Sequence, residues 1–160
     1  MTEYSSALNN AQDFVLDPRL QNDCLQVMDL PLSRLLLMND SNYPWFILVP
    51  RRAELCELFE LNQADSRQLQ HESNLLGRTL MRVCHGQKLN VAALGNIVAQ
   101  LHIHHVVRFT DDAAWPGPVW GAHPAQPYSE QAAQQLAGKV RAELEAQPLV
   151  VGSNLSENLG

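Results

Sequence analysis

Three histidines fall within four positions of one apolar stretch, and their spacing could support chemistry on a substrate. His102, His104 and His105 lie in the run QLHIHHVVRF, which begins at Gln100. Successive side chains of a strand point to opposite faces, so Gln100, His102 and His104 are predicted to share one face, together with Arg108. We expect an open chemical surface on a rigid support there. The other face is apolar apart from His105, which we expect to be a satisfied, semi-buried histidine.

Three interpretations of this surface are open. The first is a solvated strand face on which His102 and His104 only contact water. The second is a metal site, because two imidazoles separated by one residue can bind one cation, although the sequence lacks a third ligand at a supporting spacing. The third is nucleophilic catalysis on a phosphorus or acyl centre. Imidazole suits this role because its pKa near 6.5 leaves a neutral, attacking form at pH 7.

The composition of the chain limits the partners of such a site. The 160 residues carry a formal net charge of −6 at pH 7 and are 46% hydrophobic. A polynucleotide binder needs a dense basic face, so the acidic balance argues against polymeric nucleic acid. A small anionic ligand is compatible with this charge, because one or two arginines or helix-end amides suffice.

The sequence also predicts a cytoplasmic protein without a membrane segment. Residues 1–12 are polar and lack the basic start and apolar core of a signal peptide. The longest apolar runs, Leu35–Met38 and Trp45–Pro50, are too short to span a bilayer. The cysteines are scattered among apolar residues, which predicts buried thiols in a reducing compartment. They are Cys24, Cys56 and Cys84.

The elements that must hold the histidine-rich run follow from the apolar pattern. The runs Leu35–Met38 and Trp45–Val49 flank turn-forming residues and predict an antiparallel hairpin. Apolar residues at helical spacing predict one long amphipathic helix over Gln63–Cys84. Another strand is expected over Leu89–Leu94, followed by the strand-like run Val98–Phe109.

The remaining signals predict two more helices and a loop. Asp17-Pro18 can cap a short helix ending near Asp23, and Ser129 can cap a last helix. Residues 115–121 must form a loop, because two prolines and two glycines allow neither helix nor ladder.

We therefore expect an α+β fold, an antiparallel sheet with one long helix. The chain is expected to form a single domain over residues 1–160. Its core spans about 14–109, a C-terminal loop and helix span about 110–150, and a tail spans 151–160.

The segment Gly95–Arg108 resembles the signature of the histidine triad (HIT) superfamily. In that signature, Gly-Gln-Ser/Thr-Val precedes three histidines that alternate with apolar residues, and an arginine follows. Upstream, a strand, a turn, a strand ending in Val-Pro, the basic pair Arg51-Arg52 and a long helix come in the family's order. The resemblance covers about residues 14–109 and implies a HIT-like fold. Residues 115–121 resemble a bacterial branch of these proteins.

Two positions depart from the signature. Gln100 stands at the first triad histidine, and His105 stands at the apolar position after the third. On this alignment His102 matches the family's nucleophile and His104 matches the last triad histidine. Gln100 keeps a hydrogen bond but cannot donate a proton as an acid. Proton transfer typically contributes about 10²–10⁴-fold, so only substrates with good leaving groups are expected to react if that position matters.

The resemblance implies nucleotidyl chemistry on adenylated or dinucleoside polyphosphate-type small molecules. In the family, the middle histidine attacks the α-phosphorus, and the nucleotidyl-histidine is then hydrolysed or passed on. The catalytic residues expected here are thus His102, His104 and Gln100, in a hydrolase without cofactor or metal. The superfamily usually forms two-fold dimers, so a homodimer is expected. The alternatives are a non-catalytic nucleotide-binding protein that retains the pocket and a metal-dependent hydrolase.

Four further residues are expected to bind the substrate. Asn96 stands in the place of a family glutamine and is expected near the phosphate. Asn39 and Asp40 lie where the family contacts the ribose hydroxyls, although Asn-Asp in a turn is also ordinary turn chemistry. Asn90 can reach the sugar or phosphate from the neighbouring strand.

For three other side chains, the sequence allows two interpretations each. Trp115 and Trp120 can line a base pocket, or they can anchor a core or a subunit interface. Arg108 can face the phosphate, but its family counterpart more often supports the fold or a partner chain.

Overall fold

The structure, a computed structural model, describes residues 13–152. The polar segment at 1–12 and the tail from residue 153 onward lie outside the described residues. The elements along the chain are α1 (Pro18–Asp23), β1 (Cys24–Asp29), β2 (Ser33–Met38), β3 (Trp45–Pro50), the short 3₁₀ helix η2 (Leu58–Glu60), α2 (Gln63–Cys84), β4 (Lys88–Ala93), β5 (Ile103–Arg108) and α3 (Glu130–Glu145).

The strands form one five-stranded antiparallel sheet in the order β1-β2-β3-β5-β4. The predicted hairpin is β2–β3, in which Leu35 lies opposite Leu48. The histidine-bearing strand β5 lies inside the sheet between β3 and β4. The predicted α+β class, an antiparallel sheet with one long helix, is confirmed.

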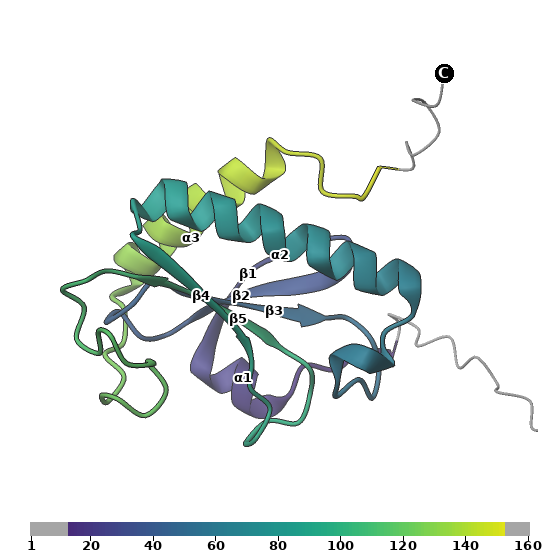
Figure 1. Cartoon of the computed structure of the whole chain (residues 1–160), viewed down its shortest axis with the longest axis horizontal. Coiled ribbons are helices and arrows are strands. Elements are labelled where there is room, and N and C mark those ends of the chain that lie inside the picture. Colours follow the sequence, from purple (N-terminus) through teal and green to yellow (C-terminus); the bar gives the residue numbers. More distant parts are fainter. Residues whose placement is uncertain (1–12, 153–160) are drawn as a thin grey trace, which may run out of the picture.

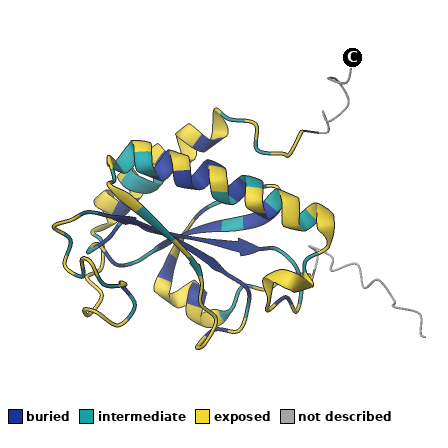
Figure 2. Ribbon diagram, in the orientation of Figure 1, coloured by how far each residue is buried: buried dark blue, intermediate teal, exposed yellow. Residues whose placement is uncertain are grey.

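Helices cover both faces of this sheet. Figure 1 shows α2 and α3 along one face and α1 on the opposite face. Because successive side chains of a strand point to opposite faces, each inner strand contributes side chains to two apolar layers. Figure 2 shows that these strands are buried. Leu35, Leu37, Phe46 and Leu48 belong to the layer that packs on α2 and α3. Leu36, Ile47, Val49 and Val106 belong to the layer on the α1 side.

The long helix α2 has the bounds predicted from its pattern. Asn62 caps it, since its side-chain oxygen accepts a hydrogen bond from the Asp65 backbone N–H at 2.9 Å. The helix ends where His85 adopts a left-handed conformation with φ 53°. A Cβ at the following Gly86 would collide with Val107 on β5, so this glycine lets the chain pass close to the sheet. None of the helices within residues 13–152 combines the length and apolarity needed to cross a bilayer.

Two features of the strands were not predicted. The sequence did not reveal β1, because a bulge between Gln26 and Met28 breaks its alternation. The run expected to be a strand from Val98 is a strand only from Ile103. Residues 98–102 therefore approach the sheet as a loop, and strand alternation does not extend back to Gln100.

The cysteine prediction is correct in part. Cys24 is buried, and burial raises the pKa of its thiol to about 12. Cys84 is half-buried and Cys56 is exposed, so the expectation of three buried thiols is wrong. Cys56 lies in the irregular segment after β3, where the adjacent Leu55 is buried but does not indicate burial of its neighbour.

Candidate active site

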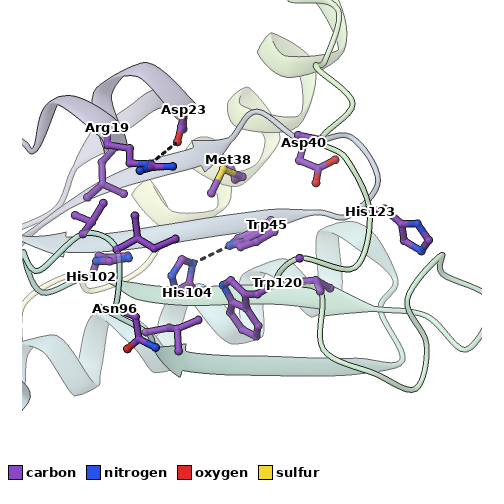
Figure 3. Close-up of a pocket in the computed structure, with 17 residues that line it drawn as sticks. Arg19, Asp23, Met38, Asp40, Trp45, Asn96, His102, His104, Trp120 and His123 are labelled. Carbon is purple, nitrogen blue, oxygen red and sulfur yellow. Dashed lines mark hydrogen bonds and ion pairs between the residues drawn. The ribbon is translucent and has the colours of Figure 1, made fainter.

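A cavity of about 430 Å³ lies on the α1 side of the sheet, next to β3 and β5. Helix α1, the loop between β4 and β5 and the loop after β5 complete its walls. Figure 3 shows the polar and aromatic side chains that line it. They include Arg19, Asp23, Asp40, Trp45, Asn96, His102, His104, Trp120 and His123. Of the three residues predicted to be catalytic, the cavity is therefore lined by His102 and His104.

His102 is held at the end of the loop that enters β5. Its ring is 5% exposed, and Nδ1 lies 2.6 Å from the backbone carbonyl oxygen of Gln100. A carbonyl oxygen can only accept, so Nδ1 carries the proton and donates it. The other nitrogen, Nε2, then has its lone pair available for a reaction in the cavity.

His104 follows on the same face, with its ring centroid 4.8 Å from that of His102. The side chain is 4% exposed, and its Nδ1 is hydrogen-bonded to the indole of Trp45 at 2.9 Å. Burial, together with the smaller effect of the neighbouring His102 and His105, lowers the pKa of His104 to about 3. The ring is therefore neutral at pH 7.

Two tryptophans form the aromatic wall beside these rings. The centroid of Trp120 is 5.3 Å from His104 and 5.7 Å from Trp45, in edge-on geometry. The structure thus places Trp120 in the cavity. Trp115 is 38% exposed and packs against Arg108 at 5.6 Å, outside the cavity lining.

The side chain of Gln100 does not face the cavity. Its oxygen accepts a hydrogen bond from the Asp17 backbone N–H at 2.9 Å, and its amide donates to the Val15 carbonyl at 2.8 Å. The predicted catalytic placement of this side chain is therefore corrected. It ties the segment before α1 to the loop that carries His102, while its carbonyl orients the His102 ring.

The expected open surface is also corrected, because the sheet face around the histidines is covered. Arg108, at the far end of β5, is only 1% exposed. Its guanidinium binds both carboxylate oxygens of Asp112 at 2.7 and 2.9 Å and lowers the pKa of that carboxyl. Asp112 also accepts the backbone N–H groups of Phe109 and Ala114. Arg108 thus anchors the loop that leads to Trp120.

Two of the four predicted substrate-binding residues line the cavity. Asn96 is exposed at its rim. Asp40 is 5% exposed, and its Oδ1 accepts backbone N–H groups from Asn42 and Gln126, both at 3.1 Å. This carboxylate therefore joins the β2–β3 turn to the segment before α3.

The other two lie outside the cavity lining. The side-chain oxygen of Asn39 accepts the Tyr128 backbone N–H at 2.9 Å. The side-chain oxygen of Asn90 accepts a hydrogen bond from Arg108 at 2.8 Å. Both amides thus bind protein groups, and the structure does not bring them together with His102.

His105 points to the opposite face of β5 and is fully buried there. Its Nε2 is 2.7 Å from the hydroxyl of Ser73 on α2, and its Nδ1 is 3.2 Å from the Ile103 carbonyl oxygen. Burial lowers its pKa to about 4. The prediction of a satisfied histidine is confirmed, and its burial is deeper than expected.

Sequence reasoning missed Trp45 and Arg19 as cavity residues. Arg19 on α1 is the one lysine or arginine among the residues that line the cavity, and its side chain lies 3.9 Å from Asp23. Trp45 lies opposite Val106 in the pairing of β3 with β5, a pairing that the sequence does not specify. Within the described chain, no three His, Cys, Asp or Glu side chains lie close enough together to hold a metal ion.

Comparisons with known proteins agree with one another. The family model described as the HIT domain matches residues 19–111. A histidine triad protein from Sinorhizobium meliloti is 41% identical, with a TM-score of 0.82 over 84% of this chain and 99% of that one. One from Marinobacter aquaeolei is 44% identical, with a TM-score of 0.82 over 84% of this chain and 98% of that one.

A more distant structure shares the fold alone. A hypothetical histidine triad nucleotide-binding protein from Sulfolobus tokodaii is 13% identical, with a TM-score of 0.58 over 79% of this chain and 89% of that one. The search of curated proteins gave no match.

Proposed function

The chain belongs to the HIT domain family, and on that premise we propose that it is a nucleotidyl hydrolase with His102 as its covalent nucleophile. Proteins of this family are nucleotide-binding hydrolases or transferases. The observation that carries the proposal is the hydrogen bond from His102 Nδ1 to the Gln100 carbonyl, which in the neutral ring places the lone pair on Nε2, in a side chain that lines the cavity. The substrates proposed are adenylated or dinucleoside polyphosphate-type small molecules.

In the first step, the lone pair of His102 Nε2 attacks the α-phosphorus and forms a P–N bond. The bond from phosphorus to the group beyond it breaks, and that group leaves with the electron pair. In the second step, water attacks the same phosphorus and the P–N bond breaks. The nucleoside monophosphate is released, its water-derived proton passes to solvent, and His102 recovers its lone pair.

Charge develops on the phosphate oxygens in both steps. The ring of His104 lies beside His102, and we assign its Nε2–H as the donor that meets this charge. Asn96, at the rim of the cavity, is the second proposed donor. Arg19 is the cationic side chain available to the substrate's phosphates. The indole faces of Trp45 and Trp120 provide an apolar surface for the base.

The orientation of the Gln100 side chain determines whether it can help to protonate the leaving group. Because its amide binds the backbone at Val15 and Asp17, the side chain offers no proton to a departing group. We therefore expect turnover to fall steeply as the leaving group becomes more basic. The same observation favours the second candidate function, a nucleotide-binding protein without turnover.

One experiment separates the two functions. The wild type and His102→Ala are given a panel of adenylated substrates with leaving groups of graded pKa, and AMP binding is measured by calorimetry. If the protein is a hydrolase, the wild type should release AMP, and the rate of release should fall by about 10⁴-fold or more in His102→Ala. AMP binding without product from any substrate would establish the binding protein. Loss of activity on chelation would indicate a metal-dependent hydrolase.

We further propose that the protein is a homodimer built across the edge strand β4. This strand is hydrogen-bonded to β5 on one side and lies at the end of the sheet. Val91 on β4 is 50% exposed and so places an apolar side chain at this unpaired edge. Light scattering should give twice the chain mass, and Val91→Lys should shift the mass toward the monomer. A monomer at micromolar concentration would contradict this proposal.

A further inference from the structure

The indole of Trp45 is the direct hydrogen-bond partner of His104. Trp45 is the first residue of β3 and lines the cavity, and Figure 3 shows its bond to His104. The Nε1 atom of Trp45 lies 2.9 Å from Nδ1 of His104. The two side chains are 6% and 4% exposed, so water does not compete with this bond.

The bond decides which nitrogen of His104 holds the proton. An indole N–H can only donate, so Nδ1 of His104 must accept and cannot itself be protonated. A neutral imidazole with an unprotonated Nδ1 carries its hydrogen on Nε2. We propose that Trp45 is a positioning residue that fixes His104 as the Nε2–H tautomer. His104 then presents a donor, and not a lone pair, to the cavity.

The two cavity histidines thereby have opposite tautomers. His102 donates from Nδ1 to a backbone carbonyl and has a free lone pair at Nε2. His104 accepts at Nδ1 from Trp45 and has its hydrogen at Nε2. One ring attacks and the other stabilises negative charge. The reverse tautomer of His104 would direct a lone pair at the phosphate oxygens and repel them.

The catalytic meaning of this inference rests on the proposed function, but the tautomer does not. The tautomer of His104 is a property of the free protein and can be measured without a substrate. Burial, which keeps His104 neutral, supports the assignment because an imidazolium would carry hydrogens on both nitrogens.

Trp120 offers a matched control. Its ring centroid is 5.3 Å from that of His104, and the Trp45 centroid is 5.6 Å away. Both indoles meet the imidazole edge-on, at 81° for Trp120 and 60° for Trp45. Within the described residues, however, Trp120 Nε1 has no hydrogen-bond partner. Substituting either tryptophan by Phe removes a similar aromatic contact, and only Trp45→Phe removes the donor to His104.

The test is long-range ¹H–¹⁵N NMR of the histidine rings at pH 7.5, with His104→Gln used to assign the His104 signals. We expect wild-type His104 to be protonated at Nε2, with a ¹⁵N–¹⁵N coupling across the hydrogen bond from Trp45. Trp120→Phe should leave this pattern intact. Trp45→Phe should shift His104 to a mixture of tautomers and lower kcat by about tenfold, with a much smaller change in KM.

Three results would overturn the inference. They are an Nδ1–H tautomer in the wild type, an unchanged tautomer in Trp45→Phe, and an equal shift in Trp120→Phe. The coupling across the hydrogen bond is read on the wild type, so its absence overturns the proposal even if Trp45→Phe fails to fold. A fixed tautomer in a protein that turns over no nucleotide would refute the proposed function and leave the role of Trp45 standing.

Discussion

His104 and His105 are consecutive residues of β5, and they face opposite sides of the same sheet. Both are buried, and burial lowers the pKa of both, to about 3 and about 4. His104 lines the cavity beside His102, with one nitrogen bound to Trp45. His105 has both nitrogens within hydrogen-bond distance of protein groups, Ser73 and Ile103.

This difference teaches that burial and a depressed pKa do not identify a reactive histidine. The core histidine has the more complete set of protein partners, so it contributes to the stability of the fold. The cavity histidine keeps one nitrogen without a protein partner among the described residues, and that nitrogen is available to a ligand. The predictions below use this contrast.

The largest expected effect comes from making the same substitution at the two neighbours. His104→Leu removes the proposed Nε2–H donor and should lower kcat by about 10²–10³-fold, the usual cost of losing one donor to a developing oxyanion. His105→Leu should change kcat by less than about threefold, because its ring does not reach the cavity. Steady-state hydrolysis by both variants checks this. Equal losses in the two would remove the distinction between the faces.

The second prediction concerns acid stability. The folded-state pKa of His105, about 4, lies below its unfolded value near 6.5. The unfolded chain therefore binds a proton first as the pH falls, and the free energy of unfolding decreases between about pH 6.5 and 4. The stability is present above this window and is lost within it, on the order of 3 kcal/mol for this group.

Urea unfolding at pH 7.5 and pH 4.5 measures this loss. The unfolded chain also protonates His104 in this window, whereas the folded-state pKa of about 3 keeps His104 neutral, so the wild type should lose about twice as much stability as His105→Leu. Paired carboxylates such as Asp112 titrate below the window, because Arg108 lowers the pKa of that group. An identical loss in the wild type and in His105→Leu would show that His105 is not neutral in the folded protein.

A smaller effect is expected from the partner of His105. Ser73→Ala leaves the His105 Nε2 buried without its partner, and it should lower the free energy of unfolding by about 1–2 kcal/mol. Asn74→Ala, at the exposed neighbour on α2, should change it by less than about 0.5 kcal/mol. Denaturant midpoints give both values. Loss of kcat in Ser73→Ala without loss of stability would connect the core face to catalysis.

The smallest effect is expected at the position where the signature has a histidine. Gln100→His should not raise kcat by more than about twofold, because the Gln100 side chain points to Val15 and Asp17 and away from the cavity. It should cost about 1 kcal/mol of stability through the two lost hydrogen bonds. Gln100→Glu keeps the acceptor for the Asp17 N–H but sets a carboxylate oxygen against the Val15 carbonyl oxygen, so it should also lose stability. A tenfold gain in kcat in Gln100→His would instead show that the side chain at position 100 reaches the reacting groups.

Local signals in the sequence predicted most of the fold. Helical spacing of the apolar residues gave the bounds of α2, and the turn residues between two apolar runs gave the β2–β3 hairpin. The strand β1 could not be predicted, because its bulge hides the alternation. The residues just before β5 were also misassigned as strand, since no local signal in the sequence shows where the loop ends and the strand begins.

The site was predictable only where it is local in sequence. His102 and His104 are two residues apart, so the signature alone placed them together. Trp45, Arg19 and Trp120 reach the cavity through the pairing of β3 with β5, the path of α1 and the loop after β5. These depend on non-local packing. Asn90 carries a plausible residue type, but Arg108 occupies its side-chain oxygen.

The most direct test of the central claim is the mass of the intact protein during a single turnover. The wild type is mixed with an excess of an adenylated substrate that has a good leaving group, quenched at high pH and analysed by mass spectrometry. The account predicts an adduct of one nucleoside monophosphate that maps to His102, and the adduct should be absent in His102→Ala. Product release with no adduct at His102 at any time, or an undiminished adduct in His102→Ala, would contradict it.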